Sequence, residues 1–114
     1  MISFACRTID FEELFSCSFG LKKTDYKIFN IILQSGKRLT VSSIAKILGK
    51  ERTVVQKSVK SLLEKRLVKR YQENIQNGGY RFYYEAEDKE EIRKRLLEII
   101  RRWSSNVEDV VSKW

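Results

Sequence analysis

Residues 40–63 read TVSSIAKILG (40–49) and KERTVVQKSVKSLL (50–63), a pattern typical of two short helices joined by a tight turn. Thr40 can cap the first helix, small Ala45 lets two helices approach closely, and Gly49 permits a sharp turn. Apolar residues at helical spacing can fill the junction between the helices. They are Ile44, Leu48, Val55, Val59 and Leu62. We therefore predict two packed helices, over residues 40–48 and 51–65.

A β-hairpin is predicted directly after these helices. Residues 67–74 and 80–85 are rich in Tyr, Phe and Val, as strands are. Asn77-Gly78-Gly79 lies between them, and Asn and Gly accept the positive φ angles that tight hairpin turns require. A short strand around residues 38–40 could add a third strand to this hairpin.

Helix-start signals at Asp10, Thr24 and Asp88 predict three further helices. Gly20 ends the first of them and Gly36 ends the second. The fold class predicted from this order is mainly α with one small β-hairpin.

The chain of 114 residues has no proline, no repeat and no low-complexity segment, so we predict a single domain over 1–114. It would comprise an N-terminal helix (1–20), a core (21–85) and a C-terminal helix (86–114). The core carries fifteen Lys and Arg against five Asp and Glu, a net charge of +10, whereas the whole chain carries +8. This concentration indicates a surface that binds a polyanion. The alternative is a solvated basic surface without a partner.

Several classes of protein are excluded or disfavoured by missing residues. The chain has no His, which excludes His-based catalysis and His-containing zinc sites, and its two Cys cannot supply four zinc ligands. No glycine-rich phosphate loop occurs either. We therefore expect no enzyme, no metal and no cofactor.

Apolar runs of only a few residues are too short for a membrane span of about 20 residues, and no signal peptide is visible. We expect a cytoplasmic protein that does not enter a membrane. Cys6 and Cys17 are expected to be reduced and buried as small apolar residues rather than to form a redox switch. A disulfide remains open if the source is a hyperthermophile.

The two helices and the hairpin resemble the winged helix-turn-helix of the MarR and TrmB-like transcriptional regulators, especially small archaeal ones. Residues 62–70, LLEKRLVKR, look like the exit of the second helix into the wing. The resemblance covers residues 21–85 well and implies a regulator that binds DNA. The chain departs from the pattern at Lys50 and Glu51, where an apolar residue and Ser or Asp are frequent, and at Arg66, where Gly is common. A left-handed backbone at Arg66 would cost about 1 kcal/mol.

The second helix of the pair has a polar face that suits the major groove of DNA. Arg can bond a guanine edge, Gln an adenine edge and Lys the phosphates. The predicted contacts are Arg52, Thr53, Gln56, Lys57 and Lys60, and no acidic residue lies between Arg52 and Lys60. Ser42 and Ser43, at the start of the first helix, could meet a phosphate. An ordinary solvated helix face, with the two Ser residues as local caps, is the alternative.

Polar residues around the glycine tip suit contact with phosphates or the minor groove. The predicted wing contacts are Arg70, Gln72, Asn74, Gln76, Asn77 and Arg81. A polar hairpin that only keeps the protein soluble is the alternative. The wing aromatics lie on both of its faces, and we assign them to packing rather than to base stacking.

An apolar stripe along the last helix predicts a dimer interface with a second copy of the chain. The stripe residues are Ile92, Leu96, Ile99, Trp103, Val107, Val110 and Trp114, and Phe11, Leu14 and Phe15 of the N-terminal helix are expected to join them. Residues 104–106 could interrupt the last helix, and packing of both ends within one chain is the alternative. A dimer would place two recognition helices about one DNA turn apart and favour a pseudo-palindromic site.

The function predicted from the sequence is that of a homodimeric regulator that binds double-stranded DNA sequence-specifically. The alternative is a winged-helix module that binds DNA or RNA without base specificity, or binds a protein. The sequence does not identify a small-molecule effector.

Overall fold

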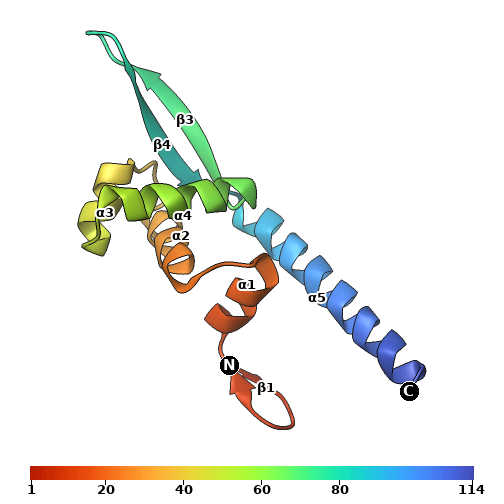
Figure 1. Cartoon of the computed structure of the whole chain (residues 1–114). Helices are drawn as coiled ribbons and strands as arrows, with labels where there is room; N and C mark the ends of the chain where they lie inside the picture. The colour runs from red at the N-terminus through yellow and green to blue at the C-terminus, as the bar shows by residue number, and fades with distance from the viewer. The chain divides into compact units, whose positions relative to one another are not determined.

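The computed structural model describes residues 1–114 and contains five helices and two small antiparallel sheets (Figure 1). The elements are β1 (Ile2–Ser3), β2 (Thr8–Ile9), α1 (Phe11–Phe19), α2 (Lys23–Ser35), α3 (Val41–Leu48), α4 (Arg52–Glu64), β3 (Val68–Asn74), β4 (Tyr80–Ala86) and α5 (Lys89–Ser112). Contacts divide the chain into two units. Leu21–Glu87 forms one, and Met1–Gly20 with Asp88–Trp114 forms the other. The predicted fold class, mainly α with a β-hairpin, is confirmed.

The core of unit Leu21–Glu87 is built where α2, α3 and α4 meet. Its fully buried side chains are Ile28, Ile32, Ile44, Val55, Val59, Leu62 and Leu67. Four of the five residues predicted to fill the helix junction are among them, whereas Leu48 is half-buried. The helix pair is therefore held together by the apolar stripe on one side of α4.

Local caps set the ends of α3. The Thr40 hydroxyl accepts a hydrogen bond from the Ser43 backbone N–H at 3.1 Å. Gly49 adopts the left-handed conformation (φ 73°) that reverses the chain after α3. At the start of α4, Glu51 occupies the cap position without a side-chain cap hydrogen bond. Glu51, which stands where Ser or Asp is frequent, thus does not cap α4 with its side chain.

One predicted helix start differs from the structure, and one predicted capping bond is absent. Thr24 is not a cap: α2 begins at Lys23, and the Asp25 carboxylate accepts a hydrogen bond from the Lys22 backbone N–H at 3.0 Å. A carboxylate at the third helical position accepts from the backbone of the cap residue. The helix therefore begins earlier in the chain than predicted. Asp88 does occupy the cap position of α5, but its side chain makes no capping bond.

The wing is the β3–β4 hairpin, whose antiparallel register runs from Val68 opposite Ala86 to Asn74 opposite Tyr80. Gly78 and Gly79 supply the positive φ angles of the tip, 86° and 85°. The expected third strand is reduced to a single bridge between Leu39 and Tyr84.

Arg66 takes the left-handed conformation (φ 55°) between α4 and the wing. It is the only residue other than glycine with a positive φ. This conformation therefore destabilises the folded chain by about 1 kcal/mol at Arg66.

The other unit contains α1, α5 and a two-stranded β1–β2 hairpin that the sequence did not predict. Helix α5 is one continuous helix of 24 residues, so residues 104–106 do not interrupt it. Phe15 of α1 is buried, as are Ile92 and Leu96 in the first half of α5. Because α1 packs on α5, these three side chains form a small core within one chain.

Both cysteines are exposed, which contradicts the prediction that they are buried. Cys6 lies in the turn between β1 and β2, and Cys17 lies on the outer side of α1, away from Phe15. The sequence placed both residues in an apolar segment but did not show which side of that segment faces the core.

No helix of the chain is both long enough and apolar enough to cross a membrane.

Replacing Thr40 by Ala should lower the free energy of unfolding by about 1 kcal/mol, because the Ser43 N–H loses its cap. Thr40→Ser retains the hydroxyl and should stay close to the parent. Urea denaturation followed by circular dichroism measures both variants. Equal stability of the Ala and Ser variants would contradict the capping role.

Tyr84 is buried at the base of the wing, and this burial raises the pKa of its phenol. As the pH rises past about 10, the unfolded chain loses this proton while the folded chain keeps it, so stability falls. Tyr84→Phe has no such proton to lose. The unfolding free energy of the parent should therefore fall relative to that of Tyr84→Phe between about pH 9 and pH 11. A difference that does not change with pH in denaturation experiments would contradict this role of Tyr84.

Candidate nucleic-acid interface

The polar face of α4 projects from the core as the sequence predicted. Val55 and Val59 are buried on one side of the helix, which turns the remaining positions outward. All five predicted recognition residues are exposed: Arg52, Thr53, Gln56, Lys57 and Lys60. A helix that is anchored on one side and polar on the other can enter a major groove without losing its packing.

An open concavity of about 640 Å³ lies between the starts of α3 and α4 and strand β4. Its lining residues are Thr40, Val41, Ser42, Ser43, Arg52, Gln56, Tyr80, Arg81, Phe82, Tyr83 and Tyr84. No Asp or Glu is among them, and two Arg are. We call this concavity the α4–wing groove. Its lining carries positive charge without a carboxylate, which suits a polyanion.

The α4–wing groove brings together five of the predicted contact residues. They are Ser42, Ser43, Arg52, Gln56 and Arg81. Ser42 is exposed, but Ser43 is half-buried and its hydroxyl lies 2.8 Å from that of Thr40. Of the two serine hydroxyls, that of Ser42 is therefore the more accessible to a ligand.

The remaining predicted residues lie outside the groove lining. Thr53, Lys57 and Lys60 continue along the exposed side of α4. The other wing residues are exposed on the hairpin: Arg70, Gln72, Asn74, Gln76 and Asn77. The predicted set thus spreads over a helix face, a groove and a hairpin tip.

The aromatic wall of the groove was not predicted. Tyr80, Phe82 and Tyr83 line it, and the rings of Tyr80 and Phe82 lie 5.0 Å apart. The Arg70 guanidinium lies 4.4 Å from the centre of the Phe82 ring, within the range of a cation–π contact. The strand register could have indicated the grouping of Arg70, Tyr80 and Phe82, because the even-numbered residues of the two strands share a face. Tyr83 is odd-numbered and lies on the other face of β4. Here Arg70 lies opposite Tyr84, and Gln72 opposite Phe82.

Strand β4 also presents a free backbone edge to the groove. Glu87 N–H bonds to Leu67 and Ile75 N–H to Gly79, so odd-numbered residues of β3 and β4 form the hydrogen-bonded pairs. The backbone groups of even-numbered residues of β4 therefore point away from β3. Tyr84 pairs there with Leu39, and no strand pairs with this edge at Tyr80 or Phe82.

Arg81 has a raised pKa because of the side chain of Tyr83, two residues along the same face of β4. An Arg guanidinium is charged at every ordinary pH even without this shift. No group of three or more Cys, Asp or Glu side chains is arranged to hold a metal ion. The groove offers hydrogen-bonding groups, positive charge and aromatic surface.

Comparison with known proteins agrees with this geometry. Residues 15–90 match the family model described as the sugar-specific transcriptional regulator TrmB. The Methanocaldococcus jannaschii protein MJ1503 is 37% identical over 109 residues, which cover 96% of this chain and 79% of the relative. A structure described as a possible transcriptional regulator from Methanosarcina mazei has a TM-score of 0.92 and 30% identity, covering 100% of this chain and 96% of that one.

A more distant structure has the same fold. A variant of S. aureus MepR, solved bound to an oligodeoxyribonucleotide, has a TM-score of 0.54 and 18% identity over 90% of this chain and 72% of that one. The fold is thus the winged helix-turn-helix of archaeal regulators and of MarR-like regulators. The chain belongs to the TrmB family of DNA-binding transcriptional regulators and is not an enzyme.

Proposed function

We propose that this chain acts as a homodimer that binds a pseudo-palindromic site in double-stranded DNA and regulates transcription by occupying a promoter. In this proposal α4 enters the major groove and the wing contacts the backbone or the minor groove. The observation that carries it is the grouping of Arg52, Gln56 and Arg81 around one groove without a carboxylate. The DNA-bound MepR variant, which shares the fold, supports the choice of partner.

Direct reading of bases is assigned to the start of α4. Arg52 and Gln56 lie one helical turn apart on the side of α4 that lines the groove. Arg can bond the O6 and N7 atoms of guanine with two hydrogen bonds, and Gln can bond the N6 and N7 atoms of adenine. Lys57 and Lys60 are exposed further along α4 and would contact phosphates, which carry no sequence information.

The dimer is assigned to the second half of α5. Phe15, Ile92 and Leu96 are already buried within one chain, so they contribute to the interface only by supporting it. Beyond Ile99, Trp103 is 57% exposed and Val110 71% exposed, and Val107 and Trp114 are exposed as well. Contiguous exposed apolar surface of this kind marks an interaction site.

A second copy of the chain is the occupant that best fits this surface. Trp103, Val107, Val110 and Trp114 are spaced 4, 3 and 4 residues apart, so the stripe reads the same in both directions. A symmetric stripe suits the self-complementary contact that a two-fold axis requires. Phe11 of α1 is also exposed and can extend the interface.

Selection of binding sites from a random duplex pool tests the proposed function. Enrichment of a palindromic motif is the expected result. Uniform affinity for all duplexes would instead indicate an architectural protein. Absence of duplex binding would overturn the proposal and favour RNA or a protein partner.

Arg52→Ala and Gln56→Ala should each relax the preference at one base position of the selected motif, at a cost of about 1–3 kcal/mol in binding free energy. Lys57→Ala, one residue away on the same helix, serves as the control. It should weaken binding to matched and mismatched duplexes equally. If changing Arg52 and Gln56 together leaves the sequence preference unchanged, the assigned docking of α4 is wrong.

Val107→Glu should convert the protein to monomers, because it places a charge in the centre of the apolar stripe. Ser105→Glu introduces the same charge on the opposite side of α5 and should leave the dimer intact. Sedimentation velocity over a range of protein concentrations measures both. A dimer that persists in Val107→Glu would place the interface elsewhere.

A further inference from the structure

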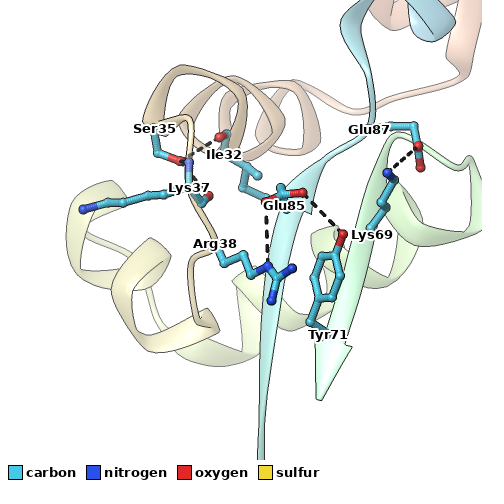
Figure 2. Close-up of polar contacts among 8 residues, drawn as sticks. All are labelled: Ile32, Ser35, Lys37, Arg38, Lys69, Tyr71, Glu85 and Glu87. Carbon is cyan, nitrogen blue, oxygen red and sulfur yellow. Dashed lines mark hydrogen bonds and ion pairs between the residues drawn. The ribbon is translucent and has the colours of Figure 1, made fainter. Parts of the chain in front are cut away.

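The segment between α2 and α3 is joined to both strands of the wing by three side chains, Arg38, Tyr71 and Glu85. The Arg38 guanidinium carbon lies 3.5 Å from the centre of the Tyr71 ring. The Arg38 Nε lies 3.7 Å from Glu85 Oε2, and the Tyr71 hydroxyl donates to Glu85 Oε1 at 3.4 Å. Figure 2 shows the three side chains together, with Tyr71 on β3 and Glu85 on β4. We call this cluster the wing brace.

Backbone contacts fix the same segment beside the wing brace. Leu39 and Tyr84 exchange two hydrogen bonds, of 2.8 and 2.7 Å. At the end of α2, the Ser35 hydroxyl donates to the Ile32 carbonyl at 2.7 Å and accepts from the Lys37 N–H at 3.3 Å (Figure 2). Arg38 is thus presented to the wing from a segment that is tied at both ends.

A second ion pair closes the base of the hairpin. Lys69 on β3 lies 3.3 Å from the Glu87 carboxylate, which raises the pKa of Lys69 (Figure 2). This pair links β3 to Glu87, the residue that follows β4. The wing brace adds side-chain links between the wing and the segment before α3 to the backbone bridge of Leu39 and Tyr84.

The rest of the wing has little support of its own. Val68 and Tyr84 are buried at its base, whereas residues 72–81 are exposed. A two-stranded hairpin alone is only marginally stable in water. Seven residues per strand extend about 24 Å, so a rotation of about 10° at the base would move the tip by about 4 Å. A shift of that size breaks any hydrogen bond between the tip and DNA.

From this geometry we infer that Arg38 and Glu85 are positioning residues that fix the direction of the wing relative to α3 and α4. They act through Tyr71 and the strands and do not contact DNA. The inference rests on the proposed function, because it assigns the wing direction a role in DNA binding. It also explains an acidic residue in a basic unit: the Glu85 carboxylate holds Arg38 in place.

Neutralising Glu85 tests this role, because the direction of the change in DNA affinity distinguishes loss of the brace from loss of a repelling charge. A carboxylate near DNA repels phosphates, so its removal by itself tightens binding. Glu85→Gln should nevertheless weaken duplex binding by about threefold to tenfold, because the ion pair that holds Arg38 in the brace is lost. Glu73→Gln is the matched control: Glu73 lies on the same face of β3, opposite Arg81, and outside the brace. It should tighten binding, by up to about threefold. If both variants tighten binding, the inference is overturned.

A distance measurement tests the brace without DNA. Spin labels on Lys46 of α3 and Asn77 of the wing tip, in a Cys6→Ser, Cys17→Ser background, report the direction of the wing by electron–electron resonance. With labelled chains diluted in an excess of unlabelled chains, so that distances within one subunit dominate, the parent should give one narrow distance distribution. Arg38→Ala and Tyr71→Ala should broaden it. Tyr71→Phe keeps the ring under Arg38 and should stay narrow.

The two experiments separate the two proposals. If Arg38→Ala broadens the distance distribution but the parent does not bind duplex DNA, the role of the brace is supported and the proposed function is wrong. An unchanged distribution in Arg38→Ala and Tyr71→Ala would overturn the brace even if the parent binds DNA. Thermal melting of each variant identifies any loss of fold, and Arg38→Lys shows whether a charge without a planar stacking group suffices.

Discussion

The burial of one side of α4 is the constraint on which the rest of the structure depends. Val55, Val59 and Leu62 pack against α2 and α3, and this packing holds α4 at a fixed angle to its neighbours. The same stripe determines which residues of α4 face outward. Every polar residue between Arg52 and Lys60 except Ser58 is therefore exposed. A single apolar stripe thus provides both the stability of the core and the orientation of the candidate DNA-binding face.

Features that depend on a few neighbouring residues could be predicted from the sequence. The cap at Thr40, the turn at Gly49 and the glycine tip of the wing follow from local backbone preferences, and the structure has them at these positions. The predicted start of α2 was wrong because two candidate capping residues, Thr24 and Asp25, lie within the same turn of helix. Asp25 reaches the backbone of Lys22, and Thr24 does not cap the helix.

Features that depend on distant parts of the chain could not be predicted. The exposure of Cys6 and Cys17 depends on how α1 packs against α5 and on the β1–β2 hairpin. The aromatic wall of the α4–wing groove requires β4 to lie beside the starts of α3 and α4, which no local pattern specifies. The same holds for Arg38, since its position beside Tyr71 depends on the bridge between Leu39 and Tyr84.

The two units of the chain carry different kinds of surface. The α4–wing groove is lined by Arg and lacks carboxylates, whereas the exposed end of α5 is apolar and residues 86–114 have no net charge. Dissolved ions screen charged contacts over about 10 Å at 0.1 M and leave apolar burial largely intact. For a dimer held by α5 and bound to DNA through α4, a rise in ionic strength would release the DNA while the two subunits stay together. Ionic strength would then control the occupancy of the site separately from the assembly of the protein.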